Sequence, residues 1–437
     1  MSSDSHILIA AQFPSIWGNR NVVLLWLSQL VSLFGDSIFY LSVIWLALEI
    51  TGDSGTAGLV AMSLYLPMIV VGLAGGSLVD RWDRRRTMIL ADAARCLLVL
   101  LFPLLFFSGH LTALLIAVLA FSVESFSSIF LSARDVLVGE LTPKAHLTKA
   151  NALVQSALPI AMITGPAVAG LLLPWVGIAH LFTVDAATFV ISLLLLVAIT
   201  KTPRRLEADR PRKKLYDEVK AGLRYAARDN IFRWLLTITA VDNWFIMGPA
   251  IIGMPILVRE VIGGPHAVFG IQLEVAQIFA LTIAFLAGGF IVGNIFIHHL
   301  HLRLNRGRVL LIGIFFDGIT HVPLMFLREP ELVFLAMFAH GLSIPAILVT
   351  RTTMVQEMVP KEYQGRAFAL INMTVKGVTA LSIGVTGFIA AAIGANTLFG
   401  IWGLIAASLG PIGWAVHSLR EAGPVTAASV SEENKVE

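Results

Sequence analysis

Carboxylates inside long apolar stretches are the residues of this sequence best placed to do chemistry. Asp36 lies in the run LVSLFGDSIFYLSV, and Glu124 lies in AFSVESFSSIF. Ionisable groups are expensive in such surroundings, and a carboxylate that is neutral while dry can release its proton when water enters. We take Asp36 as the first candidate for a proton-coupling residue and Glu124 as the second. The alternative is that these carboxylates only form hydrogen bonds to a neighbouring helix. We favour this structural interpretation for two other carboxylates within apolar segments, Asp185 and Asp242.

A second group of charges is concentrated in one short turn. Six of the seven residues from Asp80 to Arg86 are charged, although only 14% of the whole chain is. A charged turn between two helices can bind helix ends and carboxylates of other segments. If these groups face the turn in only one conformation of the protein, the binding energy stabilises that conformation. The sequence therefore predicts a gate latch, with Glu140 as a carboxylate partner. For Arg85 and Arg86 the alternative is that they only fix orientation in a membrane.

The elements that must position these charges are transmembrane helices. The chain is 57% hydrophobic and its mean hydropathy is +0.82, a balance that no soluble globular protein needs. Helices of about 20 residues span a bilayer, and a β-barrel would show short alternating segments instead. We therefore predict an all-α polytopic membrane protein. The twelve expected segments are 22–48, 55–79, 87–107, 111–133, 149–174, 177–199, 231–258, 267–297, 308–327, 331–353, 365–392 and 394–418.

The longest polar break divides these segments into two groups of six. A shift of 217 residues places ARDVLVGELTPKAHLTKANAL on TRTTMVQEMVPKEYQGRAFAL, which indicates two copies of a six-helix unit. We predict a six-helix half over 1–200, a cytoplasmic linker with an amphipathic helix over 201–230, a second half over 231–420 and a disordered cytoplasmic tail over 421–437.

Basic residues orient this bundle. Most Lys and Arg residues fall on one side of the twelve segments, whereas Arg259 and Arg328 fall on the other. Lys and Arg stay on the side from which insertion occurs. We expect a multi-pass protein of the plasma (inner) membrane with both termini in the cytoplasm. The net charge of +3 then reflects topology and contact with the lipid bilayer, and it gives no reason to expect a nucleic-acid partner.

Several kinds of site are not expected. His298, His299 and His301 end an apolar segment without a nearby carboxylate or Cys, so we interpret them as interfacial and expect no metal. Gly72 and Gly76 favour helix packing within one chain, and hence a monomer. The sequence shows no phosphate-binding loop and no HExxH or GxSxG motif. We therefore expect neither enzyme activity nor a cofactor.

The charged turn also carries a family resemblance. GSLVDRWDRRRTMILAD resembles the signature between the second and third helices of the major facilitator superfamily. Stretches such as LALEITGDSGTAGLV and GLSIPAILVTRTTMVQEMVPKEYQGRAFAL resemble its macrolide-efflux and siderophore-export branch of drug:proton antiporters. The resemblance implies two pseudo-symmetric six-helix halves with the substrate held between them near the bilayer midplane.

The resemblance also implies roles for residues of the turn. Asp80 is expected to cap segment 365–392 and to meet Arg84, and Asp83 replaces the usual glycine and adds a second carboxylate. In the second half Asp80 maps onto Ile297, so a weaker latch is expected there. The expected cytoplasmic gate residues are Asp80, Arg81, Asp83, Arg84, Glu140, and, as the second-half pair, Arg303 with Glu357.

Aromatic and polar residues of the segments are candidates for the substrate cavity. Such residues suit amphipathic ligands that are held by area and shape. The candidates are Trp26, Gln29, Tyr40, Tyr65, Asn243, Trp244 and Met247. The sequence thus predicts a secondary active transporter that exports a lipophilic or amphipathic, drug-like or macrolide-like molecule by proton antiport. The alternatives are transport of a lysophospholipid, siderophore or metal ion, or a transporter-like receptor that moves nothing.

Overall fold

The computed structural model describes residues 16–71, 82–143, 146–200, 223–224 and 226–423. Within these residues, twelve helices are long and apolar enough to cross a membrane, which confirms the predicted all-α class. These spans are Arg20–Thr51, Ser54–Val71, Arg84–Phe107, Ala113–Leu141, Leu147–Leu173, Trp175–Val197, Asn230–Ile262, Val275–His301, Arg306–Met325, Pro330–Met358, Tyr363–Ile393 and Ala395–Ala415. Asp80, Arg81, most of the expected amphipathic helix and most of the expected tail lie outside the described residues.

The chain forms two compact units. Unit 1 comprises Met1–Ile50 and Ser63–Pro211, and unit 2 comprises Thr51–Met62 and Arg212–Glu437. The short segment Thr51–Met62 therefore belongs with the second unit although it precedes most of the first along the chain.

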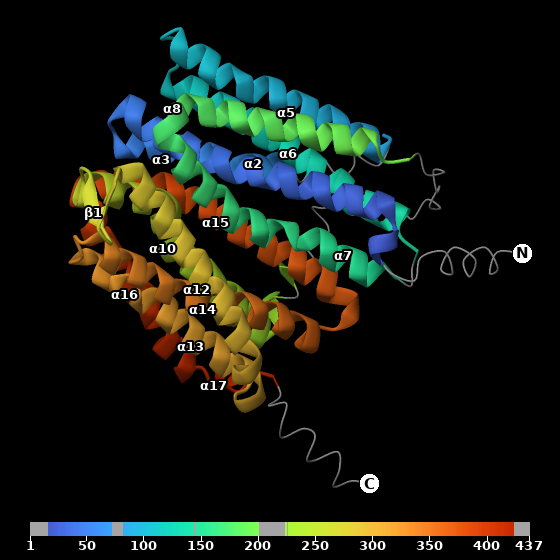
Figure 1. The fold of residues 1–437 in the computed structure, drawn as a ribbon. Helices are drawn as coiled ribbons and strands as arrows, with labels where there is room; N and C mark the ends of the chain where they lie inside the picture. The colour runs from blue at the N-terminus through green and yellow to red at the C-terminus, as the bar shows by residue number, and fades with distance from the viewer. Residues whose placement is uncertain (1–15, 72–81, 144–145, 201–222, 225, 424–437) are drawn as a thin grey trace, which may run out of the picture. The chain divides into compact units, whose positions relative to one another are not determined.

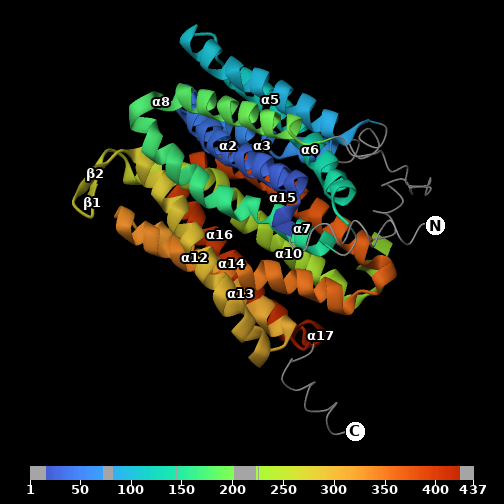
Figure 2. The ribbon, with the colours of Figure 1, turned by 45° about the vertical axis from the view of Figure 1, so that its right-hand side comes forward.

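Unit 1 is built from long helices. The 3-10 turn η1 (Ile16–Gly18) precedes α2 (Arg20–Thr51), and α5 (Arg84–Phe107), α6 (Ala113–Leu141), α7 (Leu147–Gln155) and α8 (Ala157–Val197) follow. Figures 1 and 2 show α5 running beside α6 and α8. Inside α8, Gly177 has a φ of 74° and marks a kink between two helical stretches. A residue with a Cβ is strained in that conformation, so glycine is suited to this break.

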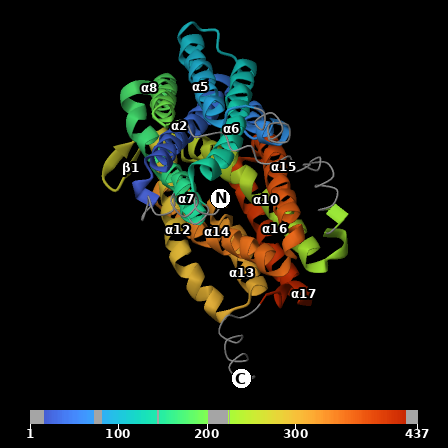
Figure 3. The same cartoon turned by 90° about the vertical axis from the view of Figure 1, so that its right-hand side faces the viewer.

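Unit 2 contains the remaining elements. In chain order they are α3 (Ser54–Ser63), α10 (Asn230–Gly248), the π-helical turn η3 (Pro249–Gly253), α11 (Met254–Leu257), the π-helical turn η4 (Val258–Ile262), β1 (His266–Val268), β2 (Ile271–Leu273), α12 (Val275–Arg303), α13 (Arg306–Ile319), the 3-10 turn η5 (Val322–Met325), α14 (Pro330–Met358), α15 (Lys361–Ile393), α16 (Ala395–Ala415) and α17 (His417–Arg420). Helix α12 runs along α14 (Figures 1 and 2). Figure 3 shows α17 beside α13, and α17 contacts the start of that helix at Gly307.

The eighth span begins later than predicted because a hairpin precedes it. Strands β1 and β2 pair antiparallel, with His266 opposite Leu273. The two turn residues Phe269 and Gly270 have φ values of 48° and 80°, as a two-residue hairpin of matching twist requires. A capping box between Glu274 and Gln277 then starts α12 at Val275, eight residues after the predicted residue 267.

Short polar side chains set the start of several helices. Asp83 accepts a hydrogen bond from the Arg86 amide at the start of α5, and Asp229 accepts one from the Phe232 amide at the start of α10. Asn305 does the same for the Arg308 amide at the start of α13. Each cap satisfies a backbone donor that the first helical turn leaves without a partner.

Candidate functional site

A buried ionic network lies inside unit 1. Nη1 of Arg95, on α5, lies 3.3 Å from Oδ1 of Asp36 on α2. The other terminal nitrogen of Arg95 donates to Asp92, one turn earlier on α5, and to the Ser32 hydroxyl at 3.1 Å. Only 1% of Arg95 is exposed. One guanidinium thus joins the proton-coupling candidate Asp36 to a second buried carboxylate.

Aromatic rings and a hydroxyl hold this network in place. The Arg95 guanidinium lies over the rings of Phe130 and Phe189, at 4.7 and 4.3 Å from their centroids. The hydroxyl of Ser192 donates to the other oxygen of Asp92 at 2.6 Å. Cation–π contacts and the hydrogen bonds of both terminal nitrogens hold the guanidinium in this position.

A third carboxylate packs against the same part of α2. A Cβ added to Gly35 would lie 2.3 Å from Oδ1 of Asp185 on α8, so the glycine lets α8 approach next to Asp36. Asp185 is fully buried, and its Oδ2 makes no hydrogen bond to any residue that the structure describes. With Asp92, these carboxylates outnumber the Arg95 guanidinium by three to one. All three cannot be ionised together without leaving uncompensated charge in the apolar interior, so the cluster is suited to hold a proton.

Glu124 belongs to a neighbouring polar group. The Tyr40 hydroxyl forms a hydrogen bond with Glu124, and the Tyr40 and Tyr65 rings meet edge to face at 5.9 Å. Glu124 also interacts electrostatically with Asp185. The structure therefore brings Glu124 together with two of the predicted cavity residues, close to the Arg95 network.

The other predicted cavity residues are separate from this group. Trp26 meets Trp17 edge to face at 5.7 Å, and Gln29 is buried on α2. In unit 2, Asn243 is buried and donates to the Thr239 carbonyl. Trp244 and Met247 of the same helix are half-buried.

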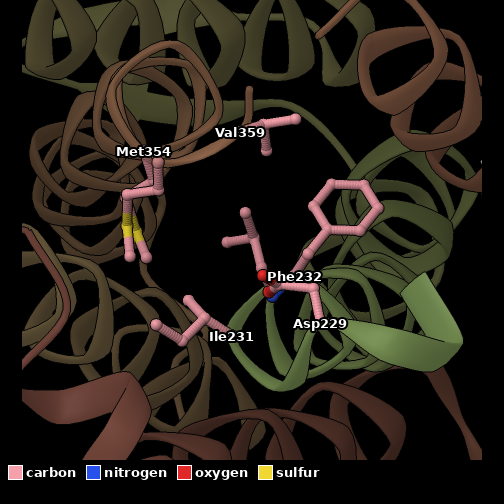
Figure 4. A pocket seen from close by; sticks show the side chains of 7 residues that line it. Asp229, Ile231, Phe232, Met354 and Val359 are labelled. Atoms are coloured by element: carbon pink, nitrogen blue, oxygen red, sulfur yellow. The ribbon is translucent and has the colours of Figure 1, made fainter. Parts of the chain in front are cut away.

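A small cavity lies at one end of unit 2, between α10 and α14 (Figure 4). Its volume is about 60 Å³, whereas pockets for drug-sized ligands measure roughly 300–1,000 Å³. Figure 4 shows Met354 and Val359 facing Phe232 and Ile231 across it. It is too small to hold a drug-sized substrate.

The residues predicted to form a gate make local contacts within their own units. Arg84 lies 3.6 Å from Glu140 in unit 1, as an ion pair between the charged turn and α6. Asp83 caps α5, so its carboxylate already has a backbone partner. Asp80 and Arg81 lie outside the described residues.

The predicted pairing of Glu357 with Arg303 is corrected by the structure. Glu357 instead accepts two hydrogen bonds from Arg306, at 3.1 and 3.2 Å. Arg303 is the last residue of α12 and is exposed, whereas Arg306 opens α13 and is buried against α14. The helix break between the two arginines decides which of them faces Glu357.

Two members of the buried network, Asp92 and Arg95, were not singled out by the sequence analysis. Both lie in the stretch ADAARC, inside an apolar segment and three residues apart. That spacing places two opposite charges on one helix face, which is the signal that could have found them.

Relatives of this chain are bacterial transporters. It is 27% identical to the uncharacterized MFS-type transporter YfiS of Bacillus subtilis (strain 168), over 91% of this chain and 94% of YfiS. It is 25% identical to the multidrug efflux pump Tap of Mycobacterium tuberculosis (strain ATCC 25618 / H37Rv), over 90% and 93%. It is 24% identical to macrolide efflux protein A of Streptococcus pyogenes, over 86% and 90%.

A solved structure shows the same fold. A bacterial homologue of the human lysosomal transporter Spinster, in an inward-facing conformation, superposes with a TM-score of 0.71 at 13% identity. The match covers 93% of this chain and 99% of that one. The family model described as transmembrane secretion effector matches residues 18–431. The chain therefore belongs to the transmembrane secretion effector family of major facilitator superfamily transporters.

Proposed function

We propose that this transporter exports a lipophilic or amphipathic small molecule in exchange for protons, by alternating access. The observation that carries the proposal is the buried network of Asp36, Arg95 and Asp92, with Asp185 beside it. A site with more carboxylates than cations holds protons while it is dry and can release one when a cavity opens to water. Its protonation state then depends on the conformation of the transporter, as coupling requires.

The aromatic groups beside the network favour an amphipathic substrate. Tyr40 and Tyr65 offer ring surface next to Glu124, so an apolar body and a polar group could be bound at one place. Release of a proton from this region leaves a negative charge that a polar or cationic part of a substrate would compensate. The efflux names of Tap and macrolide efflux protein A support export as the direction.

The gate in this proposal is cytoplasmic. The distribution of Lys and Arg supports placing both termini and the charged turn in the cytoplasm of a bacterial inner-membrane protein. The ion pairs Arg84–Glu140 and Arg306–Glu357 then lie at the cytoplasmic ends of the two units. Conformational change would require the charged turn, including Asp80 and Arg81, to exchange partners there.

The experiment is transport by proteoliposomes that hold ethidium or erythromycin, with and without an imposed pH gradient. Wild-type protein should move at least one of the two probes faster with the gradient. Asp36→Asn should lose the response to the gradient and keep saturable probe binding, and Glu124→Gln is the second variant. Glu329→Gln is the control, because that carboxylate is exposed and makes no capping hydrogen bond to α14.

An unchanged gradient response in Asp36→Asn would remove Asp36 as the coupling residue. Saturable binding without movement by wild-type protein would instead favour a non-transporting receptor. No binding of either probe would turn attention to a lysophospholipid, siderophore or metal ion as substrate.

A further inference from the structure

A second buried ionisable cluster lies in unit 2, far along the chain from the Arg95 network. Nδ1 of His340, on α14, lies 3.2 Å from Oδ1 of Asp317 on α13. The ring of His321, which follows α13, meets the His340 ring edge to face with 4.3 Å between centroids. Asp317 and His340 are each 3% exposed and His321 is 1% exposed. Three titratable side chains therefore share one apolar site.

The hydrogen bonds of the cluster define the roles of its members. The Ser343 hydroxyl lies 2.8 Å from Oδ1 of Asp317 and 2.6 Å from the carbonyl oxygen of His340. Nδ1 of His321 lies 2.9 Å from the Asp317 carbonyl oxygen. Because a carbonyl only accepts, Nδ1 of His321 carries the hydrogen. Its Nε2 makes no hydrogen bond to any described residue.

Packing keeps His321 in this position. Its ring stacks on Phe399 of α16 with 5.6 Å between centroids. A Cβ on Gly403 of α16 would lie 3.0 Å from the His321 Cβ, so glycine at that position allows the approach. A second positive charge on His321 would lie against His340 in an apolar environment. We therefore assign His321 a positioning role as a neutral imidazole.

Few other charges face the cluster. Helix α10 brings Asp242, which interacts electrostatically with Asp317 and with Arg351 of α14. Helix α15, which contacts α14, carries the half-buried Lys376. Helix α16 contains no ionisable side chain, and α12 carries its ionisable side chains in its last two turns, apart from its capping residue Glu274.

Among Asp242, Arg351, Asp317 and His340, the charges balance only when His340 holds a proton. Asp242 and Arg351 offset one another, which leaves the Asp317 carboxylate to be compensated by His340. An ion pair of Asp317 with protonated His340 is neutral overall, whereas loss of the proton leaves one buried negative charge. A solely structural hydrogen bond would not need two ionisable groups at membrane depth, where they are expensive.

We propose that Asp317 and His340 form a second proton-binding site, in unit 2, at which the two side chains bind one proton between them. The ligand is the proton itself. Among the described residues no group of three or more His, Cys, Asp or Glu side chains is arranged to hold a metal ion. The carboxylate network of the proposed function lies in unit 1 and this site lies in unit 2, so the two are tested separately.

The test is isotope-edited infrared titration of the full chain in nanodiscs, with its 11 histidines isotopically labelled. Wild-type protein is compared between about pH 8 and pH 5, the range in which histidine changes charge. His340→Gln should lose the signal of one titrating imidazole, and His321→Gln should lose none. These two variants are matched, because both remove a buried imidazole from the same cluster.

Asp317 is tested in the same way. Asp317→Asn should lose the signal of one imidazole, because His340 then has no anion to stabilise its charge. Asp317→Glu retains the carboxylate and should retain the signal. The variant that lacks both Asp317 and His340 should lose no more than either single variant, because the two residues bind one proton between them.

Two results would overturn the inference. One is a His340→Gln spectrum that titrates as the wild-type protein does, which would make His340 a neutral structural residue. The other is a retained imidazole signal in Asp317→Asn. Should Asp317→Asn fail to fold, the comparison of His340→Gln with His321→Gln decides the question alone. The measurement contains no substrate, so a failure of the proposed export function leaves its outcome unaffected.

Discussion

The guanidinium of Arg95 lies 3.3 Å from the carboxylate of Asp36, although 59 residues separate them in the chain. The same guanidinium binds Asp92, so it is the cation on which two buried carboxylates depend. A buried charge that loses its partner is strongly destabilising, whereas an exposed pair contributes little.

We therefore expect Arg95→Ala to lower the free energy of unfolding by about 3–5 kcal/mol, because it leaves Asp36 and Asp92 without a cation. Adding Asp36→Asn and Asp92→Asn to that variant should recover part of the loss. Unfolding of the purified proteins in detergent measures both effects. Arg328→Ala, at an exposed position, is the control. Equal unfolding of Arg95→Ala and the control would show that the network does not stabilise unit 1.

The ion pair between Arg306 and Glu357 can be tested by exchanging the charges of the two residues. Arg306→Glu and Glu357→Arg should each lower the melting temperature, because each places like charges at a bidentate contact. The double exchange should recover part of that loss. Arg303→Glu should leave the melting temperature unchanged, because Arg303 is exposed. A loss in Arg303→Glu equal to that in Arg306→Glu would contradict the assigned pairing.

The close packing of α12 against α14 can be tested at Gly341 of α14. A Cβ on Gly341 would lie 2.1 Å from the Leu286 carbonyl oxygen and 3.0 Å from the Gly289 Cα. Gly341→Ala must therefore push two backbones apart, at a cost of roughly 1–3 kcal/mol in unfolding free energy. Gly365→Ala is the matched control on α15, where the added methyl meets no atom within 4 Å. It should stabilise the helix by up to about 1 kcal/mol.

Glu421 predicts a pH dependence of stability outside the membrane spans. Hydrogen bonds from Arg308 and Arg420 lower the pKa of Glu421 to about 2, from a usual value of 4.5. Because the folded pKa is lowered, the stabilisation is fully present above pH 4.5 and is lost as the pH falls through about 2. Glu421→Gln should therefore melt below the wild-type protein at pH 7. The difference should shrink below pH 4.5, and thermal unfolding at several pH values measures it. A difference that stays constant down to pH 2 would argue against these ion pairs.

Much of the fold could be predicted from the sequence. Twelve apolar segments of spanning length are readable because every backbone polar group in lipid must be satisfied within a helix. The start of the eighth span was less readable. Residues 266–273 are apolar enough to continue a helix, but the turn at Phe269 and Gly270 makes them a hairpin. Hydropathy alone does not distinguish these alternatives.

The candidate site was only partly predictable. Asp36 and Glu124 could be selected because a carboxylate in an apolar segment is exceptional at its own position. The residues that contact Asp36 and Glu124 could not be predicted. Periodicity predicts which residues are buried, but it does not predict which neighbouring helix they face. Glu357 shows the same limit on a smaller scale, since the two residues between Arg303 and Arg306 form a helix break that the repeat offset does not detect.

The sequence by itself determined the membrane class, the number of spans and the positions where charge is buried, because each is a local consequence of moving side chains and backbone out of water. Only the tertiary structure decided that Arg95 joins Asp36 to Asp92 and that His340 meets Asp317. Those pairings join different helices or depend on which face of a helix is buried. They are set by helix packing, which glycines such as Gly35 and Gly403 permit and which no single segment specifies.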